Sequence, residues 1–233
     1  FAEDTAEHYQ FTREAQDGFA IESLRRAKAA NEDGTFQAET VPVTVKSRKG
    51  SREIAKDEQP FKSDPEKIPN MRAAFRDGGT VTAANSSSIS DGAAAQVLMR
   101  ASEAERRGVT PLARIVGCAT HAQAPAWFTT APIKAVENVL EQVGWSRADV
   151  DLYEVNEAFA VVAMAAIRDL GLDGETVNIH GGACALGHPI GASGTRILVT
   201  LLGAMQRHDA RRGVAALCIG GGEATAVALE RLH

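Results

Sequence analysis

The stretch that decides the fold is N-I-H-G-G-A-C-A-L-G-H-P-I-G-A-S-G-T-R, residues 178–196. Its glycines and its single His-Pro pair lie between a short apolar run and a helical pattern over 190–205. Glycines at this density allow tight turns and close backbone approach. The free N–H groups of a helix N-terminus favour developing negative charge, so His188 is a candidate proton donor or base. A packed histidine in a simple connection is the alternative.

Two more polar motifs follow strand-like runs. N-E-A-F at 156–159 comes after the run 151–155 and opens a helix, and C-I-G-G-G at 218–222 follows the apolar run 214–217. In α/β sheets the carboxyl ends of the strands share one edge, where ligands bind. The three motifs therefore predict that an amide, an imidazole and a thiol meet there.

From Pro111 onward the apolar pattern predicts alternating strands and helices, which is half of a layered α/β core. The expected strands are 113–120, 152–155, 176–179, 214–219 and 224–230, and the expected helices are 133–143, 158–170 and 190–205. The last two strands flank Gly220-Gly221-Gly222, which suits an antiparallel hairpin. Before Pro111 the sequence predicts helices at 12–30, 92–100 and 102–107, strands at 39–45 and 79–84, and a polar, basic loop region.

Composition restricts the function classes. The chain has 233 residues, 44% of them hydrophobic, and a net charge of -5. This charge implies no nucleic-acid or membrane-surface partner, and no apolar run approaches the ~20 residues that span a bilayer. The three cysteines, Cys118, Cys184 and Cys218, lack C-x-x-C spacing, which argues against a disulfide framework and a metal site. A cytoplasmic protein with reduced thiols is expected.

The motifs N-E-A-F, G-G-A-C-A-L-G-H-P-I-G-A-S-G and C-I-G-G-G resemble, in order, the three C-terminal motifs of the thiolase family. The resemblance implies the C-terminal half of the αβαβα thiolase core, a mixed sheet with helices on both faces, plus a loop-rich excursion domain. It divides the chain into a loop domain with the end of the N-terminal half, 1–110, and a C-terminal domain, 111–233. The N-terminal nucleophile domain is expected to be absent, so the chain alone is expected to be catalytically incomplete.

The resemblance also implies an activity: condensation of two acetyl-CoA molecules, or thiolysis of a 3-ketoacyl-CoA by coenzyme A. His188 would contact a thioester oxygen, Asn156 would act through a held water, and Cys218 would carry the proton. The Gly220 N–H would belong to a second oxyanion hole. Nearby helix dipoles or an imidazolium would raise the thiolate fraction of Cys218. A buried structural cysteine is the alternative for Cys218.

Coenzyme A thioesters would be substrates, with no bound cofactor. The resemblance implies contacts to them from Ser87, Phe128, Ala158, Phe159 and Lys62. Helix capping would also explain Ser87, ordinary packing would explain Phe128, and a solvated face would explain the basic residues around Lys62. The implied protein partners are the missing N-terminal half and further copies in a dimer or tetramer. A catalytically inactive acyl-CoA-binding or scaffold subunit remains the alternative function.

Overall fold

A four-stranded mixed sheet organises the C-terminal part of the computed structural model, which describes residues 1–232. The strand order is β3-β6-β5-β4, with β3 and β6 antiparallel, β6 and β5 antiparallel, and β5 and β4 parallel. The strands are β3 (Ala113–Ala122), β4 (Leu152–Val155), β5 (Arg212–Ile219) and β6 (Glu223–Arg231). The predicted β5–β6 hairpin around the triple glycine is confirmed.

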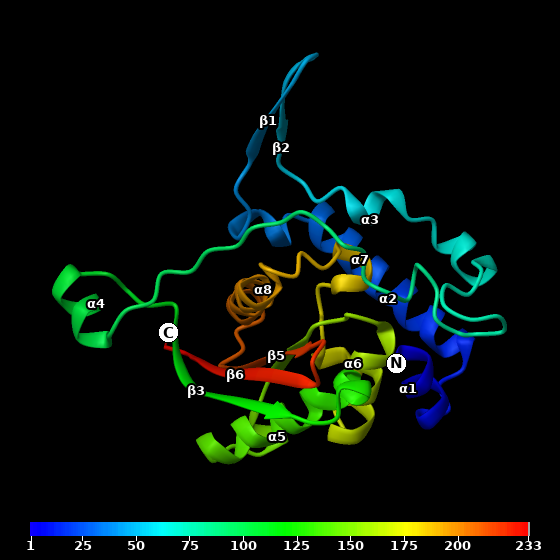
Figure 1. Ribbon diagram of the computed structural model, residues 1–233. Helices are drawn as coiled ribbons and strands as arrows, with labels where there is room; N and C mark the ends of the chain where they lie inside the picture. The colour runs from blue at the N-terminus through cyan, green and yellow to red at the C-terminus, as the bar shows by residue number, and fades with distance from the viewer. Residues whose placement is uncertain (233) are drawn as a thin grey trace.

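Helices cover both faces of this sheet (Figure 1). Along β5 alternate side chains point to opposite faces, so Val214 and Ala216 join one apolar cluster and Ala215 joins another. The first cluster packs against α5 (Ala131–Val143) and α6 (Ala160–Leu170). The second packs against α8 (Ser193–Arg207). The expected mixed α/β fold is confirmed.

The N-terminal part of the chain packs beside the sheet at the end where the motifs lie (Figure 1). Its elements are α1 (Ala2–Tyr9), α2 (Arg13–Glu32), β1 (Val43–Ser47), β2 (Gly50–Ile54), α3 (Gln59–Lys62) and α4 (Ala101–Arg107). Thr12 caps α2, because its hydroxyl accepts from Ala15 N at 3.1 Å. α2 contacts α6 and the short α7 (Ala183–Leu186), and so supports two of the three motifs from behind.

Several predicted elements before Pro111 are wrong. The Ala-rich helix over 92–100 is an extended arm instead, and a regular helix starts only at Ala101. On this arm Val97 is 85% exposed and Leu98 is 70% exposed, so its large apolar side chains are largely unpacked. Short unpacked helices are marginal in water. The segment 79–84 forms bends and irregular backbone in place of a strand, because Asn85 Oδ1 accepts from Thr82 N at 2.7 Å.

Two other predicted strands differ in extent. The strand expected at 39–45 is the first arm of an exposed hairpin, β1 and β2, which projects from the molecule (Figure 1). The strand expected at 176–179 reduces to one parallel bridge between Val177 and Tyr153. Asn178 has a positive φ of 48°, which ends the pairing there. Within residues 1–232 no helix has the length and apolarity needed to cross a bilayer.

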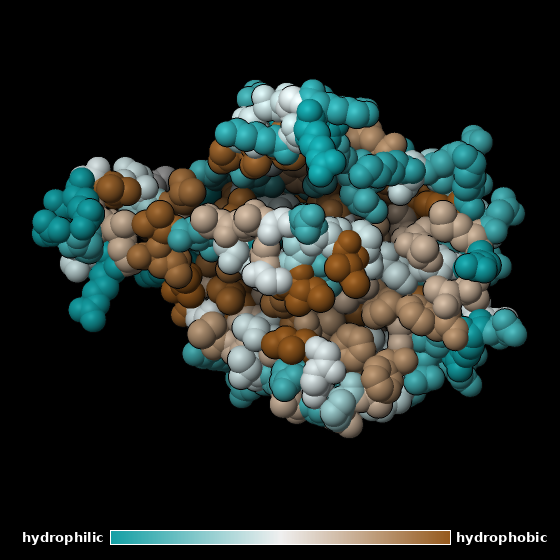
Figure 2. Space-filling view, turned by 45° about the horizontal axis from the view of Figure 1, so that its top comes forward, coloured by the Kyte–Doolittle hydropathy of each residue, from teal (hydrophilic) through white to brown (hydrophobic). Residues whose placement is uncertain are grey.

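Exposed apolar side chains lie along the arm and the neighbouring edge strand. Figure 2 shows brown surface gathered beside the arm that leads to α4. The exposed residues of this region are Val97, Leu98, Met99, Val109, Leu112 and Ile115. Large apolar strips of this kind mark contact surfaces. We call this strip the arm surface.

Candidate active site

Asn156 lies at the carboxyl end of β4. Its backbone N–H donates to Ala216 O on the adjacent parallel strand at 2.9 Å, which continues the β4–β5 ladder by one step. The side chain of Asn156 is buried and points to the same face of the sheet as α8. The sheet therefore fixes the position of this amide.

His188 lies in the loop between α7 and α8, five residues before α8 begins at Ser193. The predicted helix start at Ile190 was three residues too early. The His188 ring therefore contacts α8 through the side chain of Ser193. Its backbone N–H donates to Ser88 O at 2.9 Å. The preceding Gly187 has a φ of +85°, and a Cβ there would lie 2.1 Å from Ser90 Oγ. Gly187 is therefore required for the close approach of the serine-rich segment 86–90.

Two of the three motifs meet at side-chain level. Asn156 Nδ2 lies 3.4 Å from His188 Nε2, and His188 Nδ1 lies 2.6 Å from Ser193 Oγ. Burial, with a smaller effect from Arg196, lowers the pKa of His188, so the ring is neutral at pH 7. A neutral imidazole and a carboxamide can both donate a hydrogen bond to one oxygen atom.

Cys218 lies two residues before the glycine turn, on the strand next to Asn156. Its side chain is 7% exposed and packs in the cluster against α5 and α6. No hydrogen bond described for residues 1–232 joins its sulfur to Asn156 or His188. Burial raises the pKa of the thiol to about 12, so the expected increase in thiolate fraction is wrong for this structure. Cys218 is a protonated thiol at neutral pH.

Gly220 lies in the turn between β5 and β6, where Gly222 N donates to Ile219 O at 3.1 Å. Gly222 has a φ of +103°, and a Cβ there would lie 2.3 Å from Gln123 O. The turn therefore packs closely on the segment after β3. The role of the Gly220 N–H as an oxyanion donor stays a prediction.

The serine-rich segment joins the N-E-A-F motif to His188. Ser87 Oγ donates to Ala158 O at 2.9 Å, and Ser87 N donates to the same oxygen at 3.1 Å. Ser86 forms an isolated antiparallel bridge with Phe159, while Ser88 O accepts from His188 N. The segment therefore forms one wall shared by both motifs.

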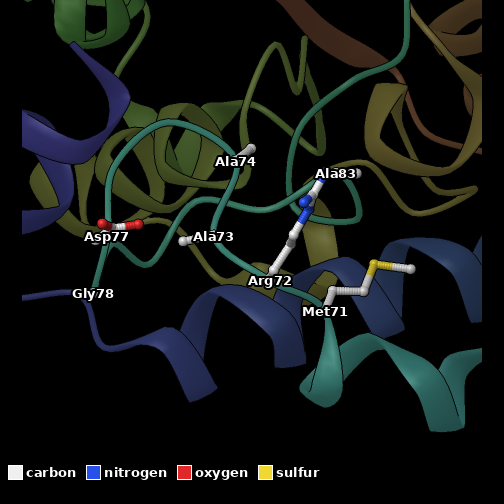
Figure 3. A pocket seen from close by; sticks show the side chains of 7 residues that line it. All are labelled: Met71, Arg72, Ala73, Ala74, Asp77, Gly78 and Ala83. Atoms are coloured by element: carbon white, nitrogen blue, oxygen red, sulfur yellow. The ribbon is translucent and has the colours of Figure 1, made fainter.

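A cavity of about 780 Å³ is lined by residues that precede this segment in the sequence (Figure 3). It is lined by Met71, Arg72, Ala73, Ala74, Asp77, Gly78 and Ala83. The side chain of Arg72 extends toward Ala83 (Figure 3), and the ring of Phe75 lies 6.2 Å from that of Phe159. Sequence reasoning missed this cavity, because its lining residues form no recognisable motif.

The remaining predicted contact residues lie further out. Phe128 is half-buried against the α5 and α6 cluster, with its ring 6.1 Å from that of Phe1. Lys62 is exposed at the end of α3 and lies 3.9 Å from Glu58. Their contacts with a coenzyme A thioester stay predictions.

Glu157 supports the site and was missed as a functional candidate. It is 1% exposed, and burial raises the pKa of its carboxyl group. It accepts from Ser23 Oγ at 2.7 Å, from Asn178 Nδ2 at 2.9 Å and from Cys184 N at 3.1 Å. Since these partners belong to α2, to the end of the Val177 bridge and to α7, Glu157 ties the N-E-A-F turn to the histidine loop.

Two histidines, His180 and His208, form a pair at the far end of α8. His180 is 6% exposed, and its Nε2 lies 3.4 Å from His208 Nε2, while its ring meets Phe36 edge to face at 6.0 Å. Burial, followed by repulsion from His208 and Arg207, lowers the pKa of His180 to about 4. Sequence reasoning selected His188 in the glycine-rich stretch and did not consider His180, which lies in the same stretch.

This pair predicts acid destabilisation. His180 binds a proton with a pKa near 6.5 in the unfolded chain and about 4 in the folded one. The free energy of unfolding therefore decreases as pH falls from about 6.5 toward 4. The loss approaches ~1.4 kcal/mol for each pH unit in that window. Urea unfolding at pH 7, 6 and 5 measures it, and His180→Gln should flatten the slope. An unchanged slope in the variant would show that His180 does not cause it.

The fold and the site define a class of protein: a layered α/β chain in which an amide and a neutral imidazole converge at the carboxyl end of a strand. Residues 109–231 match the thiolase C-terminal domain, and residues 1–102 match the thiolase N-terminal domain. The chain belongs to the thiolase family. The N-terminal domain is therefore represented in the chain, and the expectation that it is absent is corrected to that extent.

Individual relatives agree with this family. The chain is 51% identical over 233 residues to the cytosolic acetyl-CoA acetyltransferase of Mus musculus, covering 99% of this chain and 59% of the relative. It is also similar to the crystal structure of the Bacillus anthracis acetyl-CoA acetyltransferase, with a TM-score of 0.97 and 42% identity, covering 99% of this chain and 59% of that one. The Ascaris suum Acat5 thiolase in complex with coenzyme A gives a TM-score of 0.92 and 45% identity, with the same coverage of 99% and 59%. The chain thus spans less than two thirds of the length of these proteins.

Proposed function

We propose that the protein that carries this chain is an acyltransferase of the thiolase type. It condenses two acetyl-CoA molecules to acetoacetyl-CoA and coenzyme A, or cleaves a 3-ketoacyl-CoA with coenzyme A. The observation that carries this proposal is the approach of Asn156 Nδ2 to His188 Nε2, 3.4 Å apart. Two such donors stabilise negative charge on a thioester carbonyl oxygen, and each can contribute on the order of 3 kcal/mol. The relatives' names support the activity, and none supports the inactive scaffold.

In the proposed condensation, residues of this chain act one after another. Cys218, as a thiolate, removes the α-proton of acetyl-CoA, and the enolate oxygen accepts from His188 and from Asn156 or a water that it holds. The enolate carbon attacks an acylated cysteine, the carbon–carbon bond forms, and that cysteine leaves as a thiolate. During this step the Gly220 N–H faces the oxygen of the tetrahedral intermediate. The acylated cysteine is none of the three in this chain, so a further N-terminal segment supplies it.

Because Cys218 is buried, its thiol must lose a proton before it can act as the base. With a pKa raised to about 12, the thiol is first an acid, so it becomes a base only after giving its proton to another group. We propose that the coenzyme A thiolate, which leaves when the first acetyl-CoA acylates the other cysteine, takes this proton and departs as free coenzyme A. The nucleophilic cysteine enters this step as the thiolate that the previous condensation released. Cys218 then alternates as acid and base through the cycle.

The substrate's coenzyme A part is proposed to follow the wall formed by the serine-rich segment 86–90, from the cavity toward His188. Arg72 at the cavity and Lys62 on α3 offer positive charge to its phosphates, and Phe75, Phe159 and Phe128 offer apolar contact to its pantetheine and acyl parts. No resident cofactor or metal enters this mechanism.

We propose that the arm surface is covered by the further N-terminal segment of the same polypeptide, and that the whole protein is a cytoplasmic dimer or tetramer. The exposed Val97 and Leu98 support the first part, and the cytosolic Mus musculus relative supports the compartment. A degradative or biosynthetic role in fatty acid metabolism fits either direction of the reaction.

Asn156→Asp tests this function in the whole protein. The carboxylate has the same shape as the amide but repels a developing oxyanion, so kcat for acetoacetyl-CoA thiolysis is expected to fall at least ~100-fold. The loss of the acetoacetyl-CoA enolate absorbance in the presence of coenzyme A measures it. An unmodified protein that binds acetoacetyl-CoA without cleaving it would contradict the proposed activity and support a scaffold.

A further inference from the structure

Ser193, the first residue of α8, lies directly behind the candidate site. It is fully buried, and its hydroxyl oxygen is 2.6 Å from His188 Nδ1 and 3.0 Å from Pro189 O. A hydroxyl group has one proton to donate, so only one of these two neighbours can receive it fully. Which neighbour receives it decides where the imidazole carries its own proton.

The carbonyl of Pro189 is already satisfied by the backbone. It accepts from Ala192 N at 2.8 Å and from Ser193 N at 2.9 Å, which uses both of its lone pairs. His188 Nδ1 has no other described partner, and its contact with Ser193 is the shorter of the two hydroxyl contacts. Ser193 Oγ also has the geometry to donate to Pro189 O, but the shorter contact and the free acceptor at His188 Nδ1 favour donation to the ring.

The proton on the ring then follows by exclusion. A neutral imidazole has one N–H and one bare nitrogen, and a nitrogen that accepts from Ser193 is the bare one. The proton of His188 accordingly lies on Nε2. This atom faces Asn156 Nδ2 at 3.4 Å, so two N–H donors point toward one another. Two donors cannot bond each other, but both can bond an oxygen atom placed beside them.

We propose that Ser193 is a positioning residue that holds neutral His188 in the Nε2–H tautomer, so that His188 and Asn156 donate together to the carbonyl oxygen of the bound thioester. This inference rests on the proposed function for the identity of that oxygen. The tautomer itself does not depend on turnover. In metal sites, residues that orient a ligating imidazole through its second nitrogen typically affect activity 10- to 100-fold, and we expect an effect of similar size here.

The direct test is nitrogen NMR of the whole protein labelled with ¹⁵N-histidine, with the His188 signals assigned by their loss in His188→Gln. At pH 7.5 the wild-type protein is expected to show a protonated Nε2 and an unprotonated, hydrogen-bonded Nδ1. Ser193→Ala is expected to convert His188 to a mixture of tautomers or to the Nδ1–H form. A wild-type Nδ1–H ring would overturn the proposal whatever the enzyme activity is.

Kinetics provide the second readout. In thiolysis, Ser193→Ala is expected to lower kcat about 10- to 100-fold with little change in KM, because the donor pair acts mainly in the transition state. Ser193→Thr keeps the hydroxyl and is expected to restore the tautomer and most of kcat, and circular dichroism checks that each variant is folded. Normal kcat in a folded Ser193→Ala would overturn the positioning role. A wild-type protein with the Nε2–H ring but no thiolysis would instead contradict the proposed function alone.

Discussion

Cys218→Ser is expected to lower kcat for acetoacetyl-CoA thiolysis by about 10²- to 10⁴-fold in the whole protein, the usual range for loss of a general acid or base. The serine hydroxyl is isosteric but far less acidic than a thiol, even one whose pKa burial has raised to about 12. It therefore cannot exchange a proton with the substrate carbon at a comparable rate. KM should change much less than kcat, since the thiol is not needed to hold the coenzyme.

Cys118→Ser is the matched control, because Cys118 is an exposed thiol on the edge strand β3. Its activity should stay close to wild type. Iodoacetamide at pH 7 should also label Cys118 faster than Cys218, whose thiol is both buried and protonated. Near-normal turnover by Cys218→Ser would remove it from the mechanism and leave it as a structural core residue.

The sequence predicted the second half of the fold well because that half is formed by local patterns. A run of glycines between two apolar runs specifies the β5–β6 hairpin, and the apolar stripe of α8 specifies a helix that packs on the sheet. The arm over 92–100 could not be predicted in this way. Its alanines favour a helix, but packing decides whether a helix with that propensity forms. Val97 and Leu98 are largely exposed within residues 1–232, so no such packing supports one.

The site residues could be predicted where a polar side chain stands directly after a strand or before a helix. Asn156 and His188 stand at turns that follow regular elements, and the structure brings them together. Glu157 and Ser193 have the same kind of position but act through buried hydrogen bonds to residues far along the chain or behind the ring. Such partners depend on tertiary packing, which spacing does not contain. The expected thiolate character of Cys218 failed for a similar reason, since burial was not visible in the motif.

His188→Ala is expected to lower kcat for thiolysis about 10²- to 10³-fold, with KM nearly unchanged. In the proposed mechanism the imidazole N–H donates to the oxygen that gains charge in the transition state, and alanine offers no donor there. His188→Gln, which places an amide N–H in the same region, should recover part of the loss. His8→Ala, at an exposed histidine on α1, serves as the control and should leave kcat unchanged.

The pairing of His188 with Asn156 gives this prediction a sharper form. If both side chains donate to one oxygen, the second substitution acts on an oxyanion hole that has already lost one donor. The two losses in transition-state stabilisation should therefore not add. His188→Ala combined with Asn156→Ala should therefore cost less than the product of the single effects, and kcat of all four proteins measures the coupling. Independent, multiplicative effects would mean that the two side chains, although 3.4 Å apart in the structure, serve different atoms of the substrate.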